Sequence, residues 1–255
     1  MSSKQGIILF TKVPKPGLVK TRLVHPQFPE DFQVDLTTAM IQDSIIVLNE
    51  VLKKTSFLPI ISYFPGNDSA LRLMETRVIN DLRLNCRSLI DEAIFVPQIG
   101  DTLGERFSNA LKSTIDNLEV KSIVIIGSDT PHLSPYYLLQ GMEFLASNPK
   151  GIVIGPSQNG GFYLLGMNPP CPDHIDQIFQ KTSIHNELGA ALELYSNQEI
   201  HILPTVIDID TFSDLRSVFS EVYARSFTNK ITSNKRVAMH TWYVLKTLDE
   251  SIWGS

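Results

Sequence analysis

The sequence has few cysteines, and they are not grouped as in a zinc site or a disulfide framework. Cys86 and Cys171 are the two cysteines among 255 residues, with neither a CxxC pair nor a ligand spacing to histidine. No apolar run approaches the roughly 18 to 20 residues of a membrane span, and the N-terminus lacks the apolar core of a secretory signal. These absences favour a cytoplasmic protein with no membrane span.

An excess of positive charge is also missing. Lysine and arginine number 22 against 27 acidic residues, so the net charge is −5 at neutral pH. Proteins that bind nucleic acid generally carry a basic face, and we therefore expect no nucleic-acid partner. No repeat, low-complexity tract or Gly/Ser linker divides the chain. We expect one main domain over residues 1–216 and a C-terminal helical extension over 217–255.

Short aliphatic and β-branched runs alternate with longer helical patterns. This alternation predicts an α/β fold, a three-layer sandwich whose central sheet is mostly parallel. FYLLGM follows GIVIGP after a short polar turn, so one antiparallel pair should make the sheet mixed. The expected strands are GIILF, LPIISYF, AIFVPQ, SIVIIGSD, GIVIGP, FYLLGM, IHILP and VIDID. The expected helices cover 31–54, 68–77, 102–118, about 135 onward and 186–196.

Two further helical patterns follow, SDLRSVFSEVYARSF and VAMHTWYVLKTLDESI. The second has an apolar face that must be buried, either against the main domain or in a homodimer contact. That face comprises Val237, Thr241, Val244, Leu245, Leu248 and Ile252.

The loop after the first strand, TKVPKPGLVKTRL, is rich in cations and contains no acidic residue. It is not a P-loop, because Val19 stands before Lys20 where that motif needs glycine. Gly17 allows a close backbone approach, and Lys12, Lys20 and Arg22 can make charge-assisted hydrogen bonds to phosphate. The alternative is a solvated basic loop.

Three aspartates follow expected strands, where α/β sheets bind their ligands. Asp129 ends SIVIIGSD. Ser134 and Pro135 can begin the next helix, so Asp129 is not needed as its cap and could instead bind a hard cation. Asp208 and Asp210 stand two apart, which on a strand places both carboxylates on one side. Ser213 is the expected cap of the helix that follows them.

Two glycine-containing segments could approach a substrate closely. The turn Gln158–Gly161 joins two expected strands and is explained equally well as a plain hairpin. QIGDTLGERF offers Gln98 and two glycines between a strand and a helix, where a backbone could lie against a flat base.

Five segments together resemble an uncharacterised family of nucleotide-diphospho-sugar transferase-like proteins with the glycosyltransferase A fold. They are FTKVPKPGLVKTRL, QIGDTLGERF, IIGSDTPHL, GPSQNGGFYLLG and DIDTFSDL, in the family's order. The fold also includes the guanylyltransferases of molybdenum cofactor and of 2-phospho-L-lactate. The resemblance implies a transferase that uses an activated nucleotide.

The resemblance also implies roles for individual residues. Phosphates would lie at the opening loop, near Lys12, Gly17, Lys20 and Arg22, and the base near Gln98, Leu103 and Gly104. Asp129 would bind Mg²⁺ or Mn²⁺, with Asp208 or Asp210 as a second acidic residue, either catalytic or, for Asp210, metal-binding. Asn159, Gly160 and Gly161 would lie on the substrate side, and Asn159 replaces an aspartate that is usual in the family.

Two functions follow as hypotheses. The first is a metal-dependent transferase, either a glycosyltransferase with an NDP-sugar donor or a nucleotidyltransferase with an NTP. In an inverting glycosyl transfer, Asp208 or Asp210 would deprotonate the acceptor hydroxyl. The second is a nucleotide-binding regulatory module without catalysis, which Asn159 would favour. The sequence specifies neither the base, the sugar, the acceptor nor the stereochemical course.

Overall fold

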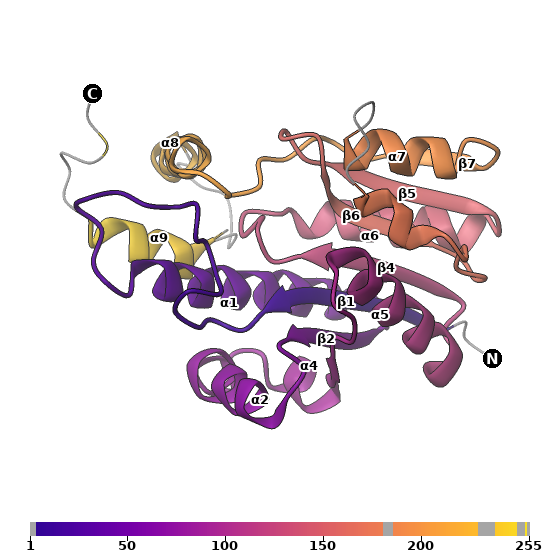
Figure 1. Ribbon diagram of the computed structural model, residues 1–255, viewed down its shortest axis with the longest axis horizontal. Coiled ribbons are helices and arrows are strands. Elements are labelled where there is room, and N and C mark those ends of the chain that lie inside the picture. Colours follow the sequence, from indigo (N-terminus) through magenta and orange to yellow (C-terminus); the bar gives the residue numbers. More distant parts are fainter. Residues whose placement is uncertain (1–3, 181–185, 229–237, 249–252, 254–255) are drawn as a thin grey trace.

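The computed structural model describes residues 4–180, 186–228, 238–248 and 253, leaving aside the side chains of 221–228. Its strands form one seven-stranded sheet in the order β3-β2-β1-β4-β6-β5-β7 (Figure 1). β6 is antiparallel to β4 and β5, and all other neighbours are parallel, which confirms the predicted mixed sheet. The strands are β1 (Gln5–Lys12), β2 (Leu58–Phe64), β3 (Ile94–Pro97), β4 (Ser122–Gly127), β5 (Gly151–Pro156), β6 (Phe162–Met167) and β7 (Glu199–Ile202).

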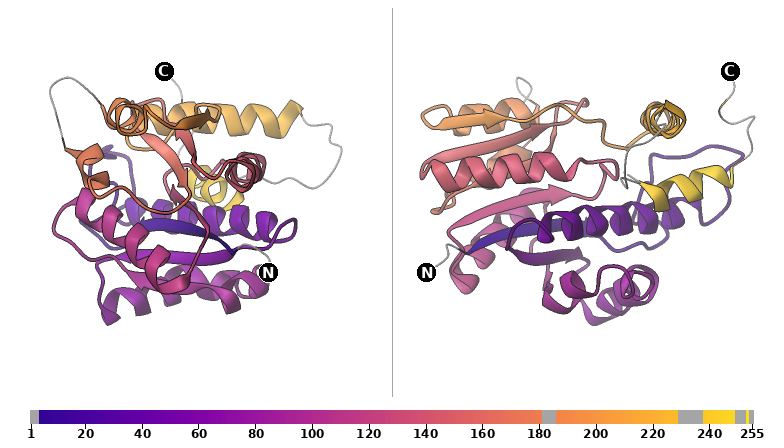
Figure 2. Two further views of the ribbon diagram at one scale, coloured as in Figure 1. Left: turned by 90° about the vertical axis from the view of Figure 1, so that its right-hand side faces the viewer. Right: turned by 180° about the vertical axis from the view of Figure 1, so that it is seen from behind.

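Helices cover both faces of the sheet, so the predicted three-layer sandwich is confirmed (Figures 1 and 2). Seen from behind, α1 and α6 lie in front of the strands (Figure 2, right). The first face carries α1 (Phe32–Leu52), α2 (Asp68–Met74), α4 (Arg87–Glu92) and α6 (Pro135–Ser147). The second carries α5 (Leu103–Leu118), the 3-10 turn η2 (Ile175–Phe179) and α7 (Glu187–Leu194).

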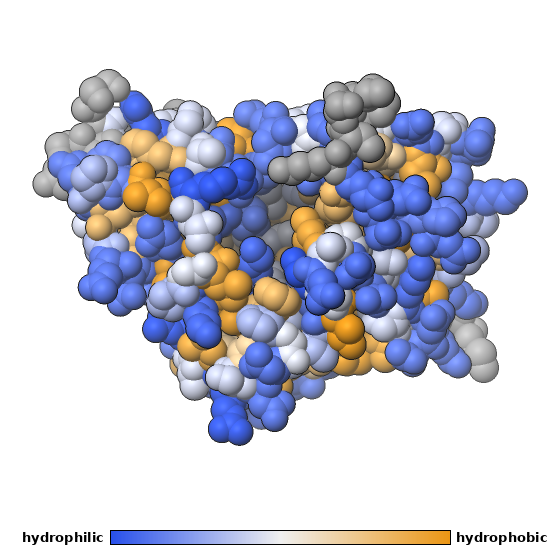
Figure 3. Space-filling model, in the orientation of Figure 1, coloured by the Kyte–Doolittle hydropathy of each residue, from blue (hydrophilic) through white to orange (hydrophobic). Residues whose placement is uncertain are grey.

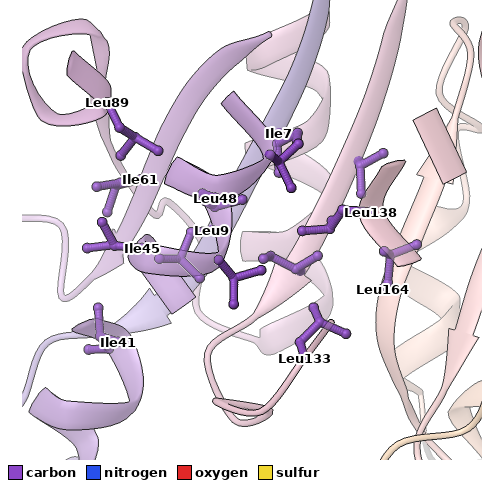
Figure 4. Close-up of a cluster of buried hydrophobic side chains, with 14 of the residues drawn as sticks. Ile7, Leu9, Ile41, Ile45, Leu48, Ile61, Leu89, Leu133, Leu138 and Leu164 are labelled. Carbon is purple, nitrogen blue, oxygen red and sulfur yellow. The ribbon is translucent and has the colours of Figure 1, made fainter. Parts of the chain in front are cut away.

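Each face of the sheet has its own apolar core. Ile7 and Leu9 of β1 point toward α1 and pack with Ile41, Ile45 and Leu48 (Figure 4). On the other face, Ile8 and Ile60 pack with residues of α5 such as Phe107 and Leu111. The alternation along β1 therefore fixes which face each side chain enters.

Helix starts are set by capping residues. Thr102 and Glu105 form a reciprocal capping box at the start of α5, and Ser134 with Pro135 begins α6 as predicted. Three short elements were not predicted, namely α4, η2 and the continuation of α2 through a π-helical turn, η1 (Glu75–Ile79), into α3 (Asn80–Leu82).

The two C-terminal helices, α8 (Phe212–Thr228) and α9 (Met239–Lys246), lie beside the opening loop and α1, on the left in Figure 1. Thr241, Leu245 and Leu248 are buried, so the predicted apolar face of α9 packs within the chain, whereas Val237 and Ile252 lie outside the described residues. A third apolar core joins these parts. It contains Leu23, Phe32, Leu36, Met40, Ile209, Leu215, Val218, Leu245 and Leu248.

A buried carboxylate attaches α9 to α1. Asp43 accepts hydrogen bonds from the backbone N–H groups of His240 and Thr241, at 3.0 and 2.8 Å, and its Oδ1 lies 3.0 Å from the His240 ring nitrogen Nδ1. The first turn of α9 thereby gains partners for its free N–H groups. No helix among the described residues has the length and apolar character of a membrane span.

Two expectations about residues 206–214 are wrong. VIDID is not a strand, because only Val206 makes a bridge, to Ser157, and the next residues form a loop. Ser213 is not the cap of α8. Thr211 takes that position, with its Oγ1 accepting from the Asp214 N–H at 3.3 Å, while Asp214 accepts from the Thr211 N–H at 2.7 Å.

Candidate active site

Lys20 turns inward from the opening loop. Its Nζ lies 2.7 Å from Asp129 Oδ1 and 3.7 Å from Asp210 Oδ1, and it donates a hydrogen bond to the Ile209 carbonyl. The side chain is only 7% exposed, and its backbone is left-handed, with φ of 47°. Lys20 therefore neutralises aspartates from two separate segments rather than extending into solvent.

The other cations of the loop are more exposed. Arg22 Nη2 lies 2.7 Å from Asp210 Oδ2, with a side chain that is 71% exposed. Lys12 is exposed at the end of β1, and no described carboxylate lies within ion-pair distance of it. Gly17 has φ of 72°, and open space lies where a Cβ would be. The loop thus combines two cations paired with aspartates, Lys20 and Arg22, with two exposed ones, Lys12 and Lys15.

Asp129, Asp208 and Asp210, which we call the carboxylate cluster, come from two loops at the carboxyl edge of the sheet. Asp129 follows β4, and its carbonyl accepts from the Ile209 N–H at 2.9 Å, which joins the two loops. Asp208 and Asp210 precede α8, where the Asp214 carboxylate accepts from the Asp210 N–H at 3.2 Å. These backbone contacts bring the three carboxylates together, although VIDID is not a strand.

Asn159 stands between two members of the cluster. Its Nδ2 donates to Asp208 Oδ2 at 2.6 Å and is 3.5 Å from Asp210 Oδ2. Its Oδ1 accepts from Ser157 Oγ at 2.8 Å and from the Gly161 N–H at 3.0 Å. Both ends of the amide are therefore used, the NH₂ group as a donor and the carbonyl oxygen as an acceptor, whereas an ionised aspartate would only accept.

Burial and like charge act together on Asp208. Removal from water, followed by repulsion from Asp210 and Asp129, raises the pKa of Asp208 to about 6, although hydrogen bonds from the backbone and Asn159 oppose the change. A carboxyl group with this pKa exchanges protons close to neutral pH.

The residues expected near a base lie on the α5 side of the same edge. Gln98 is buried, and its Nε2 donates to the carbonyls of Thr11 and Ser62 at 2.9 and 3.0 Å, which holds the ends of β1 and β2. Gly104 packs against the Asp176 carbonyl, where a Cβ would come within 2.5 Å. Leu103 is 42% exposed. Of the three, Leu103 thus offers the most accessible side chain.

The turn of residues 157–161 closes the β5–β6 hairpin and carries Asn159. Gly160 has φ of 88°, which a residue with a side chain rarely adopts, whereas Gly161 does not need a positive φ. The Gly160 N–H donates to the Ser157 carbonyl at 3.2 Å. The glycine conformation therefore serves the hairpin that positions Asn159.

Two residues at this edge, Asp214 and Arg106, were not predicted from the sequence. Asp214 holds the Asp210–Thr211 backbone, and the pattern T-x-x-D at 211–214 was a usable capping signal. Arg106 lies over the Phe64 ring, 4.3 Å from its centroid, with no described carboxylate within ion-pair distance. Nothing in the sequence marked Arg106, because the stacking depends on a contact between β2 and α5.

The carboxylate cluster has the chemistry of a divalent-cation site but is closed by Lys20. Carboxylate oxygens are the ligands that Mg²⁺ and Mn²⁺ prefer, and the pKa of Asp208 is raised first by burial and then by repulsion from Asp210 and Asp129. Among the described residues, however, no three His, Cys, Asp or Glu side chains are already arranged around a metal position. The donor chemistry of Asp129 and Asp210 suits such an ion, but in this structure both carboxylates are paired with Lys20.

Comparisons with known proteins agree with this fold. A protein from Desulfovibrio desulfuricans G20, proposed to be a nucleotide-diphospho-sugar transferase, is 26% identical, with a TM-score of 0.74 and 98% of this chain and 97% of that chain covered. A cytidylyltransferase from Leptospira borgpetersenii is 12% identical, with a TM-score of 0.50 and 98% and 96% covered, which shows a shared fold alone. A search of the curated proteins found no match.

A family model matches the middle of the chain. The family is described as "Uncharacterized protein conserved in bacteria (DUF2064)", and the match covers residues 69–184. This range includes Gln98, Asp129 and Asn159 but neither Lys20 nor Asp208. The expected resemblance is confirmed, since the chain has a nucleotide-diphospho-sugar transferase-like fold and matches this uncharacterised family over residues 69–184.

Proposed function

We propose that the chain is a transferase acting on an activated nucleotide, and that it transfers a sugar from an NDP-sugar donor with Mg²⁺ or Mn²⁺. One observation carries this proposal. Three carboxylates, two engaged cations and a hydrogen-bonding amide meet at the carboxyl edge of the sheet, the edge where α/β folds bind their ligands. The face seen in Figure 3 is hollowed near its centre.

Binding of the donor diphosphate would use both signs of charge. Asp129 and Asp210 would hold the metal ion, which supplies positive charge against the leaving nucleoside diphosphate. Lys12 is exposed and forms no ion pair with a described carboxylate, and Lys20 and Arg22 are already paired with aspartates at the same edge. These cations orient the phosphates and stabilise the charge that develops as the glycosidic bond breaks.

Asp208 is our candidate for the general base. In a direct, inverting transfer it accepts the proton of an acceptor hydroxyl. The acceptor oxygen forms the new bond to the anomeric carbon, and the bond from that carbon to the phosphate oxygen breaks, its electrons leaving with the nucleoside diphosphate. In the metal-free protein the pKa of Asp208 is raised to about 6, so the carboxylate is ionised at neutral pH and can accept a proton.

The choice of an NDP-sugar follows the likeness to the Desulfovibrio protein along nearly the whole chain. Nucleotidyl transfer from an NTP is the alternative and would use the same cations and metal ligands. A regulatory module without catalysis is less well supported. Asn159 makes four hydrogen-bonding contacts within the site, so the change from the family's aspartate leaves the amide integrated into it.

The test begins with binding and continues with turnover. A thermal-shift panel of nucleotides and NDP-sugars, each with and without Mn²⁺, should show one donor whose stabilisation requires the metal, because a ligand that binds only the native state raises its melting temperature. With that donor, Asp208→Asn should retain binding but lose at least 100-fold in turnover. If no nucleotide or NDP-sugar raises the melting temperature, the proposal is wrong.

A further inference from the structure

Lys20 is paired with the two carboxylates that would hold a metal ion. Asp129 and Asp210 would supply carboxylate oxygens to Mg²⁺ or Mn²⁺ in place of the lysine ammonium. The Lys20 ammonium lies 2.7 and 3.7 Å from Asp129 Oδ1 and Asp210 Oδ1, and it also donates to the Ile209 carbonyl. Because the two cations share these ligands and repel each other, they cannot both be held there.

The backbone of Lys20 is fixed, so the exchange must come from the side chain. Val19 is 5% exposed and Leu23, in the core shared with α8 and α9, is fully buried. The Leu23 N–H donates to the Lys20 carbonyl at 2.9 Å, which closes a turn around the residue. Lys20 can leave the carboxylates by rotating its long, flexible stem while this turn stays in place.

We propose that Lys20 is an exchangeable internal cation, which neutralises Asp129 and Asp210 until a divalent metal takes its place. This inference rests on the proposed function. Phosphates of the donor give the displaced ammonium a new partner, so the donor and the metal favour each other's binding. By linkage, the factor by which the donor raises metal affinity equals the factor by which the metal raises donor affinity.

The arrangement has a functional consequence. Before the donor arrives, the aspartates are paired and attract metal weakly. When the donor phosphates draw Lys20 away, Asp129 and Asp210 become free to bind the metal. The diphosphate whose charge the metal must neutralise is then already present. Lys20 is therefore a positioning residue that links occupation of the phosphate site to assembly of the metal site.

The deciding experiment measures the binding of Mn²⁺ without a nucleotide. Calorimetry, or the loss of the electron paramagnetic resonance signal of free Mn²⁺, gives the affinity. Lys20→Met should bind Mn²⁺ at least tenfold more tightly than the parent, because the ligands no longer have an internal cation. Lys12→Met is the matched control, since it removes the same charge from an exposed side chain beside the same loop. An equal gain in Lys12→Met, or no gain in Lys20→Met, would show that Lys20 does not compete with the metal.

A second measurement uses the unmodified protein and does not depend on how a variant folds. Acetylation of lysines, followed by mass spectrometry, should find Lys20 protected without metal and several-fold more reactive when Mn²⁺ saturates the site, with Lys12 as the internal reference. Lys20 that stays protected under saturating Mn²⁺ overturns the inference and makes Lys20 a permanent counter-ion. Because neither measurement with metal alone needs a nucleotide, their outcome separates this inference from the choice of donor.

Discussion

At the scale of single residues, Asp208 predicts a specific dependence of stability on pH. Its pKa is raised in the folded state from 3.8 to about 6, so the folded protein binds more protons than the unfolded chain between these values. Stability therefore falls as the pH rises through this window. Above this pH window, Asp208 is ionised in both the folded and the unfolded state, and its burial lowers the free energy of unfolding by the full amount.

The variant Asp208→Asn removes this cost. Its free energy of unfolding relative to the parent should rise by on the order of 1 kcal/mol from pH 4 to pH 7, after allowance for solvent screening of a half-buried group. Urea unfolding of both proteins at several pH values measures the difference. A difference that stays constant with pH would show that Asp208 titrates normally.

Asn159 offers a second prediction at this scale. Asn159→Asp places a carboxylate 2.6 Å from Asp208 Oδ2, where the parent has a donor. Without metal at neutral pH, we expect a loss of about 1 to 3 kcal/mol of stability and lower turnover, and we expect the stability to recover on acidification or with Mn²⁺.

Asn159→Ala separates the two causes, since it deletes the hydrogen bonds without adding charge. The alanine variant loses a donor to the ionised Asp208, so it should be destabilised more above the pKa of Asp208 than below it, but less at neutral pH than the aspartate variant, and Mn²⁺ should change its stability little. Chemical unfolding of the three proteins with and without metal makes the comparison. If the aspartate form has the higher turnover, the site lacks a carboxylate that it needs, and our interpretation of Asn159 as a functional amide is wrong.

At the scale of elements, the start of α8 controls Asp210. The Asp214 carboxylate accepts from the N–H groups of Asp210 and Thr211 and from the Thr211 hydroxyl. Asp214→Ala should cost about 1 kcal/mol of stability, as loss of a capping residue does, and should weaken metal-dependent donor binding because Asp210 loses its support.

Ser213→Ala is the control for this element, one residue away in the same first turn. It should leave both stability and binding nearly unchanged, because Thr211 rather than Ser213 caps the helix. Unfolding curves and donor titrations would measure the two effects. Equal losses in both variants would mean that the first turn of α8 acts only through general helix stability.

The elements also show what the sequence could predict. Aliphatic runs located seven strands, because burial on both faces leaves a continuous apolar signal in the central strands, and the half-exposed edge strands β3 and β7 keep a shorter one. VIDID carries the same signal for another reason, since Ile209 is buried in the core shared with α8 and α9 rather than in the sheet. Periodicity records burial of a side chain but not which partner covers it.

The same limit applies to the site. The positions of Asp129, Asp208 and Asp210 after apolar runs indicated that they belong at one edge. The sequence could not show that Lys20 pairs with Asp129, because that contact joins residues 109 positions apart through the folded loop. Nor could it show that the Gln98 amide is occupied by the ends of β1 and β2. Such contacts depend on tertiary packing.

At the scale of the whole molecule, the C-terminal helices form part of the structure that holds the site. Leu245 of α9 is 2% exposed and lies in the same apolar core as Leu23, three residues after Lys20, and Ile209, which lies between two site aspartates. A cavity at Leu245 should therefore loosen the opening loop and the 207–210 loop together, although Leu245 is not itself a candidate site residue.

We predict that Leu245→Ala lowers the free energy of unfolding by about 2 to 5 kcal/mol, the range for truncating a buried leucine. It should also weaken metal-dependent donor binding several-fold at temperatures where the protein remains folded, because the turn around Lys20 rests on this core. Tyr243→Ala on the same helix is the control, since Tyr243 is 60% exposed. Denaturation and donor titration of both variants make the test. Full donor affinity in folded Leu245→Ala would restrict α8 and α9 to a stabilising role and leave the sheet edge with the opening loop as the complete site.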